Sequence, residues 1–139
     1  MSKDQKWPHT ESMFEYQGYM CVVLLQRLGH RCGYVGLKDD DPRYGKKYGK
    51  LDKIECHGGL TYSAGHLLAD VPRGMWWIGF DCAHAWDAPD IEAVREIFGE
   101  FDAERAAICY NHGAPIRTRE YVEAECRNIV DQLVRGIGT

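Results

Sequence analysis

The chain has 139 residues, of which 45% are hydrophobic and 27% are charged, and its formal net charge is −4 at neutral pH. This composition is that of an ordinary globular protein and excludes an intrinsically disordered chain. The length predicts a single domain over residues 1–139. The negative charge gives no broad basic surface, so we expect no nucleic-acid duplex as a partner.

The cysteines and the first residues of the chain indicate the cellular compartment of the protein. The six cysteines stand singly and form no CxxC pair, which favours reduced thiols over disulfides or a zinc ribbon. The start of the chain is polar and lacks the apolar segment of a signal peptide, and the longest apolar run, residues 20–25, is too short to span a bilayer. We therefore expect a cytoplasmic protein with no membrane partner. The sequence leaves open whether it forms a homo-oligomer.

The first third of the chain predicts strands. Residues 1–12 are mostly polar and are expected to form a loose N-terminal arm. Residues 14–16 and 19–25 are rich in aromatic and β-branched side chains and flank a glycine-containing turn, which predicts a hairpin. Residues 31–37 predict another strand. Residues 38–53 form a long polar connection of the kind that is often functional or mobile.

The middle of the chain predicts two more strands. Residues 54–63 are expected to form a strand that Gly58 and Gly59 interrupt, and residues 64–74 a loop. The strand over residues 75–80 is the most strongly indicated in the chain, because it is an unbroken apolar run between polar segments.

Helices follow in the last third of the chain. Asp90 can cap a helix over residues 91–98, whereas residues 101–110 fit either a helix or a strand. Thr118 is a suitable N-cap for a last helix. One apolar stripe at helical spacing runs along that helix: Tyr121, Val122, Cys126, Ile129, Val130, Leu133 and Val134. Early strands and late helices predict an α+β fold, a mostly antiparallel sheet with the C-terminal helix packed on one face.

Most of the reactive side chains lie in two short stretches, residues 56–62 and 76–87, which read CHGGLTY and WWIGFDCAHAWD. The second stretch begins as an apolar run and turns polar abruptly, which is typical of a buried strand that leads into a functional loop. A buried carboxylate or imidazole costs free energy unless it is paired or coordinated. The two stretches therefore predict one site.

The first stretch can bind an anion. Gly58 and Gly59 permit positive φ angles and can expose successive backbone N–H groups, which attract phosphate or carboxylate oxygens. We expect these amides, His57 and the neighbouring Thr61 to contact an anionic ligand. The simpler alternative is a β-bulge with a surface histidine.

Three chemistries fit the two stretches together. In the first, His57, Asp81 and His84, with Cys56 or Cys82 as a further candidate ligand, bind zinc and leave one position open. In the second, Cys82 or Cys56 is a thiolate nucleophile that a spatially adjacent histidine activates, while Asp81 or Asp87 orients the imidazole. Adjacent residues on a strand point to opposite faces, so a cysteine–histidine pair must join the two stretches, for example Cys82 with His57. If the protein is an enzyme, we expect Cys82, His84 and Asp81 to be its catalytic residues.

In the third chemistry no reaction occurs. His57, Asp81, His84 and Asp87 hydrogen-bond a polar ligand while a tryptophan stacks on a planar ring. The candidates for the stacking residue are Trp76, Trp77 and Trp86, of which we expect Trp77. We favour this interpretation because no catalytic signature such as HExxH or GxSxG is complete. A further alternative is that the two stretches only hold the fold together.

The order of motifs resembles a family of short, uncharacterised proteins of bacteriophages, prophages and bacteria. The motifs that carry the resemblance are GHRCGYV at residue 29, PRYG at residue 42, HGGLTY at residue 57 and WWIGFDCAH at residue 76. They cover the chain from about residue 14 to the last helix. Trp86 departs from many members of that family, which have glycine at this position.

The resemblance implies a phage context and no specific reaction. Short phage proteins often act against host defence, and some sequester nucleotide signals. By this analogy we expect a small-molecule-binding protein with a pocket for an anionic, nucleotide-like ligand, one that sequesters a host defence signal. The alternative is a zinc- or Cys/His-dependent hydrolase that acts on a phosphorylated small molecule at the same site.

Overall fold

The computed structural model describes residues 8–108 and 113–139. A five-stranded antiparallel sheet with strand order β1-β2-β3-β5-β4 lies at its centre. The predicted hairpin, the strand over residues 31–37 and the strand over residues 75–80 are confirmed. The strands are β1 (His9–Tyr16), β2 (Tyr19–Leu25), β3 (Arg31–Leu37), β4 (Tyr62–Ala64) and β5 (Trp76–Asp81).

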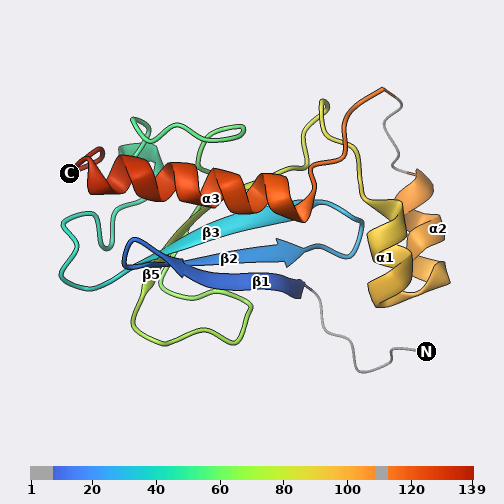
Figure 1. The fold of residues 1–139 in the computed structure, drawn as a ribbon, viewed down its shortest axis with the longest axis horizontal. Coiled ribbons are helices and arrows are strands. Elements are labelled where there is room, and N and C mark those ends of the chain that lie inside the picture. Colours follow the sequence, from blue (N-terminus) through green and yellow to red (C-terminus); the bar gives the residue numbers. More distant parts are fainter. Residues whose placement is uncertain (1–7, 109–112) are drawn as a thin grey trace.

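The helix α3 (Arg119–Val134) lies across one face of the sheet (Figure 1). Its first turn is capped by Thr118, whose Oγ accepts a hydrogen bond from the Tyr121 amide over 3.1 Å. The predicted α+β fold, with the C-terminal helix on the sheet, is therefore confirmed. The side chains of α3 that are buried against the sheet are Val122, Cys126, Ile129, Val130 and Leu133.

Two members of the predicted apolar stripe do not belong to this core. Tyr121 is 37% exposed and Val134 is 54% exposed. Both lie at an edge of the helical stripe, where the spacing alone does not separate a buried side chain from one that reaches the rim. This placement leaves Tyr121 available to the site described below.

Alternate residues of β5 serve the two faces of the sheet. Ile78 and Phe80 pack under α3, whereas Trp77 belongs to a second buried cluster on the opposite face. The segment 67–75 covers that second face with Leu67 and other apolar side chains. Trp77 is only 1% exposed. The prediction that Trp77 stacks on a ligand is therefore wrong, because no side of its indole ring is open.

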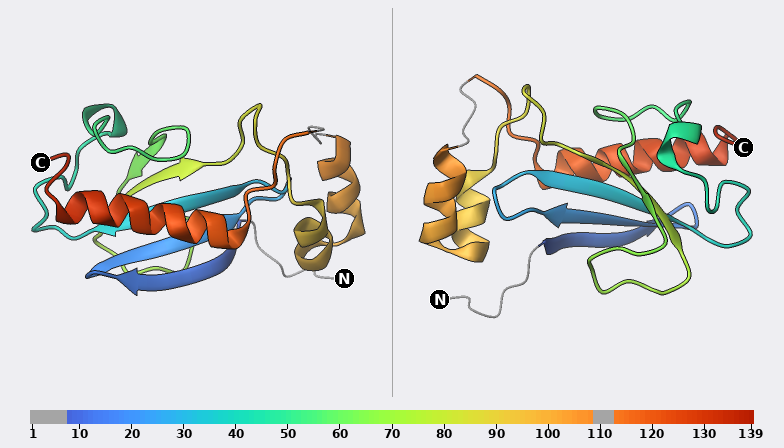
Figure 2. Two further views of the ribbon diagram at one scale, coloured as in Figure 1. Left: turned by 45° about the horizontal axis from the view of Figure 1, so that its top comes forward. Right: turned by 180° about the vertical axis from the view of Figure 1, so that it is seen from behind.

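Two short helices form a hairpin beyond one end of the sheet (Figure 2). They are α1 (Ile91–Phe98), which Asp90 caps as predicted, and α2 (Glu100–Ile108). The segment that fitted either a helix or a strand is thus helical to Ile108, and its last two residues lie outside the described part. No helix within the described ranges is both long enough and apolar enough to cross a bilayer.

Strand β1 begins earlier than the sequence indicated. His9 already pairs with Leu25 of β2, so residues 9–12 are not part of a loose arm. Strand β1 is an edge strand of the sheet, and an edge strand tolerates the polar residues that suggested an arm. Residues 1–7 of the expected arm lie outside the described residues.

The strand predicted over residues 54–63 is mostly absent, since only β4 at its end is extended. Gly58 and Gly59 have φ angles of 69° and 80°, which turn the chain instead of extending it. The backbone N–H of Glu55 donates to Gln132 of α3 over 2.8 Å, so side chains replace a partner strand. The long polar connection before it is confirmed as a loop with one short helix, η1 (Tyr48–Lys50).

Candidate functional site

The site is built on the loop that follows β5. Strand β5 ends at Asp81, and the Cys82 amide continues the pairing by donating to the Arg31 carbonyl over 2.9 Å. The loop then folds onto itself, because the Asp87 amide donates to the His84 carbonyl over 2.9 Å. The His84 amide in turn donates to Asp87 Oδ2 over 3.0 Å. This reciprocal pair fixes both side chains at the end of the sheet.

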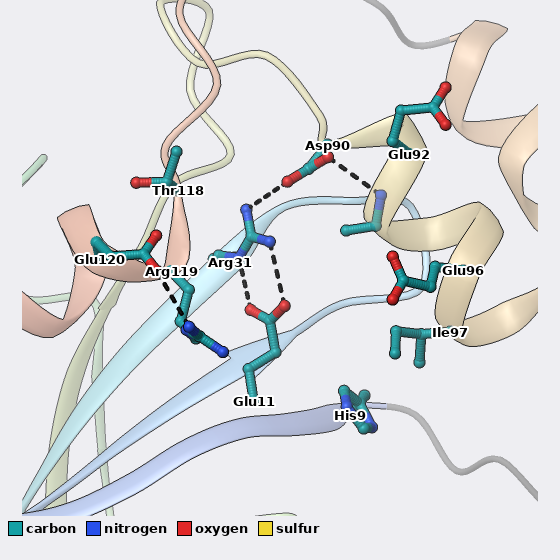
Figure 3. Close-up of a pocket in the computed structure, with 11 residues that line it drawn as sticks. His9, Glu11, Arg31, Asp90, Glu92, Glu96, Ile97, Thr118, Arg119 and Glu120 are labelled. Carbon is teal, nitrogen blue, oxygen red and sulfur yellow. Dashed lines mark hydrogen bonds and ion pairs between the residues drawn. The ribbon is translucent and has the colours of Figure 1, made fainter.

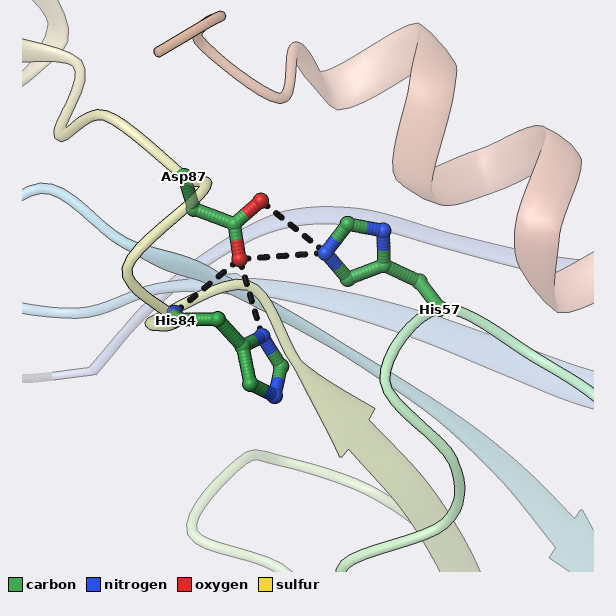
Figure 4. Close-up of side chains that lie close together, drawn as sticks. All are labelled: His57, His84 and Asp87. Atoms are coloured by element: carbon green, nitrogen blue, oxygen red, sulfur yellow. Dashed lines mark hydrogen bonds and ion pairs between the residues drawn. The ribbon is translucent and has the colours of Figure 1, made fainter.

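Asp87 is the centre of the site, and its side chain is fully buried. His57 Nε2 lies 3.0 Å from both of its carboxylate oxygens, and His84 Nδ1 lies 2.9 Å from Oδ2 (Figure 4). Arg117 Nε donates to Oδ1 over 2.8 Å. One buried carboxylate thus receives two imidazoles and one guanidinium from three separate segments of the chain.

The Asp87 carboxylate is negatively charged at neutral pH. Burial alone raises its pKa, but the hydrogen bonds from Arg117, His57 and the two groups of His84 outweigh burial and hold the pKa well below its usual range. The pKa of the Arg117 guanidinium is raised in turn, chiefly by its hydrogen bond to Asp87. The site therefore carries a fixed negative charge beside a fixed positive one.

Helix α3 positions His57 from the other side. The His57 amide donates to Glu125 Oε2 over 2.6 Å, which ties this loop to the helix. The ring Nδ1 lies 2.8 Å from the Tyr121 hydroxyl, and the His57 side chain is only 5% exposed. With its proton on Nε2, the ring donates to Asp87 and accepts from Tyr121, so both nitrogens are used.

His84 is held less tightly and is 20% exposed. Its imidazole stacks on the indole of Trp86, with the ring centroids 4.6 Å apart and the planes within 4°. The ring also lies close to Gly58, where an added Cβ would sit 2.4 Å from its Cε1 atom. Its Nε2 faces Asp81 Oδ1 at 3.9 Å. The absence of a side chain at Gly58 thus makes room for His84.

The three side chains of His57, His84 and Asp87 can together hold a metal ion, since one donor atom of each lies within 4.8 Å of the others. Zinc takes nitrogen and carboxylate ligands at about 2.0–2.2 Å, and three protein ligands with an open position are typical of catalytic sites. Two of these residues also have a polar atom held from outside the cluster, His57 by Tyr121 and Asp87 by Arg117. Outer partners of this kind orient metal ligands.

The structure brings His57, His84 and Asp87 together, and Asp87 is the carboxylate that both histidines contact. Asp81, the predicted zinc ligand, lies instead on the Nε2 side of the His84 ring, at 3.9 Å. Asp81 is held by the Thr61 hydroxyl over 3.0 Å and by the Ala83 amide over 3.1 Å. Side chains alternate between the two faces only within a strand, and Asp87 lies in the loop after β5. The sequence pattern therefore could not show which of the two carboxylates the histidines contact.

The glycine amides are less open to an anion than predicted. Both glycines adopt positive φ, as expected. However, the Gly59 amide donates to the Cys56 carbonyl over 2.9 Å, and the His57 amide is taken by Glu125. Two N–H groups of the expected anion-binding loop, those of His57 and Gly59, are therefore already used within the protein.

Cys82 does not fit the role of a nucleophile. It is 1% exposed and packs in the core beneath α3. Burial, with smaller contributions from nearby acidic groups, raises the pKa of its thiol well above the usual value. Burial likewise raises the pKa of Cys56 to about 12. Thiolate chemistry requires a lowered pKa, so the prediction of a catalytic Cys82 is wrong.

Sequence reasoning did not identify three residues of the site: Arg117, Tyr121 and Glu125. All three come from the start of α3 or the segment before it, far from both motif stretches in the sequence. Arg117 reaches the site because Ala88 bridges Ile116 and its amide donates to the Pro115 carbonyl. The helix pattern offered one signal, since Tyr121 and Glu125 are four residues apart and share a face.

A second charged cluster lines a separate hollow of about 480 Å³ between β1, α1 and the start of α3 (Figure 3). Arg31 is 5% exposed there and binds Glu11 through Nε at 2.5 Å and Nη2 at 3.1 Å. Its Nη1 donates to Asp90 over 2.9 Å and to the Arg117 carbonyl over 3.0 Å. Arg31 thus fastens the cap of α1 to the sheet.

No protein-family model, curated protein or solved structure matches the chain. The resemblance to short phage proteins therefore stays a prediction, and the function has to be argued from the geometry of the site alone.

Proposed function

We propose that His57, His84 and Asp87 bind a divalent metal ion of the zinc class and that the protein acts there on an anionic, phosphorylated small molecule. The observation that carries this proposal is the convergence of two imidazoles on one buried, charged carboxylate. Each imidazole can bind one metal ion through the nitrogen that faces Asp87, in the tautomer that carries its proton on the other ring nitrogen. Because histidine binds metal only in its neutral form, binding of this kind tightens as pH rises.

The chemistry of the bound ion follows from the number of ligands. Three protein ligands leave one position for water or for a phosphate oxygen, and zinc lowers the pKa of bound water to about 7. Arg117, 21% exposed at the side of Asp87, adds a positive charge next to that position. Hydrolysis of a phosphate ester is the reaction that this arrangement supports.

The second candidate is capture of the same ligand without hydrolysis, which suits a protein that sequesters a signalling molecule. The two further carboxylates beside the cluster favour it, because each is already engaged. Asp81 accepts from Thr61 and from the Ala83 amide, and Glu125 accepts from the His57 amide. Donors of the protein itself therefore set the orientation of both carboxylates, which suits a binding site.

Metal titration of the chelator-treated protein tests the proposal. We expect about one zinc ion per chain by elemental analysis after dialysis, and a visible absorption band when cobalt replaces zinc. His84→Ala removes the binding, and so does the more conservative His57→Gln. His66→Ala is the matched control, because His66 is an exposed histidine outside the cluster whose carbonyl accepts from the Tyr62 hydroxyl.

Two results decide between the candidates and the alternative. Release of p-nitrophenol from p-nitrophenyl phosphate or its diester by the metal-loaded protein supports hydrolysis, whereas recovery of intact bound ligand supports capture. Absence of stoichiometric metal, or an equal loss in the His66→Ala control, would overturn the metal centre. The cluster would then be a hydrogen-bonded support of the fold.

A further inference from the structure

Trp86 is the one aromatic side chain of the loop 82–88, and it lies directly beside the proposed metal ligands. One face of its indole covers the His84 imidazole at 4.6 Å, yet the side chain as a whole is 54% exposed. Trp77, in contrast, is 1% exposed, and Trp76 is partly buried and donates through its indole nitrogen to the Lys46 carbonyl over 2.8 Å. Trp86 is therefore an open aromatic surface at the edge of the site.

The position of Trp86 is fixed by its neighbours, although its outer face is open. It lies between His84 and Asp87, whose reciprocal hydrogen bonds hold the loop. Arg117 Nη2 lies 3.5 Å from the Trp86 carbonyl, and the Arg117 guanidinium stacks over Tyr121 at 5.0 Å. A rigid aromatic plane with a cation beside it is a surface on which a planar ring binds without reordering the protein.

We infer that the phosphorylated ligand is a nucleotide, whose base stacks on the outer face of Trp86 while its phosphate binds at the metal and Arg117. This inference rests on the proposed function. Aromatic rings stack with centroids at least about 4.5 Å apart, so a base on Trp86 lies roughly 9 Å from the His84 ring. The ribose of a nucleotide bridges that separation, whereas inorganic phosphate or a sugar phosphate leaves Trp86 uncovered.

The test compares two probes that carry the same phosphate. Calorimetry on the zinc-loaded protein measures the affinity for adenosine 5′-monophosphate and for ribose 5-phosphate, which lacks the base. Base–aromatic stacking predicts that the nucleotide binds roughly 5- to 100-fold more tightly. Trp86→Ala abolishes this ratio and leaves the affinity for ribose 5-phosphate and the zinc content unchanged, whereas Trp86→Phe keeps most of the ratio.

The control variant is Phe101→Ala, since Phe101 is an aromatic residue of α2 that is 67% exposed and lies away from the site. It should change neither affinity. Equal binding of the two probes to the zinc-loaded wild type would overturn the inference, as would a Trp86→Ala variant that weakens both probes equally, because Trp86 would then only support His84. Loss of zinc binding itself would be a failure of the proposed function, which the elemental analysis reports separately.

Discussion

Two buried charged groups lie near the same end of the sheet, and their partners differ in kind. Arg31 is surrounded by two carboxylates and a carbonyl, and each of its three side-chain nitrogens donates to one or more of them. Asp87 is surrounded by two imidazoles and one guanidinium. A neutral imidazole nitrogen can bind a metal ion, whereas a guanidinium has only N–H donors and cannot. Both clusters are buried and paired, and only the imidazoles of the Asp87 cluster mark it as a site.

The largest expected effect comes from breaking the Arg31 cluster. Arg31→Met leaves the Glu11 and Asp90 carboxylates without the buried cation that pairs them, and loss of one partner of a buried ion pair costs about 3–5 kcal/mol. We expect that decrease in the free energy of unfolding from urea denaturation. Zinc binding per folded chain should be unchanged.

Arg95 provides the matched control for this substitution. It also pairs with two carboxylates, Glu92 and Glu100, but on the exposed surface of α1 and α2. Arg95→Ala should leave the free energy of unfolding nearly unchanged, since exposed ion pairs contribute little. Equal effects of the two substitutions would contradict the structural role of Arg31.

A substitution in the Asp87 cluster should lower the free energy of unfolding by less than Arg31→Met does, and it should impair the proposed function more. Asp87→Asn removes the charge that pairs with Arg117 and puts an N–H group where His57 and His84 donate, at a cost of about 1–3 kcal/mol. It should also abolish zinc binding. Asp81→Asn, in the same loop and 35% exposed, should keep the zinc, because its carboxylate lies behind His84. Loss of zinc in Asp81→Asn alone would show that the ligand is Asp81.

The pH dependence of stability sharpens the same comparison. The pKa of Asp87 is lower in the folded chain than its unfolded value of about 3.9. Its contribution is thus fully present above that unfolded value and is lost as pH falls through the folded pKa. The difference in unfolding free energy between wild type and Asp87→Asn should not shrink until pH falls below about 4. A decrease between pH 7 and pH 5 would contradict this.

The parts of the fold that the sequence predicted are those where local pattern and packing agree. The apolar run of β5 and the caps Asp90 and Thr118 led to the right elements because each is settled by nearby residues. Residues 54–61 could not be predicted in the same way. Their backbone N–H groups bond to Gln132 and Glu125 of α3, which lie far along the chain and carry no local signal.

The site was predictable as a meeting of two stretches but not in its roles. The two stretches meet as expected, since His57 contacts Asp87 and its ring lies 5.5 Å from the His84 ring. The carboxylate between the two histidines is Asp87 and not the expected Asp81, because the loop after β5 turns back through its own hydrogen bonds. The choice of Trp77 failed because segment 67–75 covers that face of the sheet.

The smallest expected effect on stability comes from alanine substitutions at Gly58 and Gly59 of the first stretch, which should differ in their effect on zinc binding. Both have positive φ, so replacing either by alanine costs about 1–2 kcal/mol of backbone strain. Only at Gly58 does the new Cβ meet the His84 ring, at 2.4 Å, whereas at Gly59 nothing lies within 4 Å. Gly58→Ala should therefore displace His84 and weaken zinc binding, while Gly59→Ala should lose similar stability and keep its zinc. Equal zinc affinity in the two variants would mean that His84 is not a ligand, since a displaced ring cannot hold the ion in place.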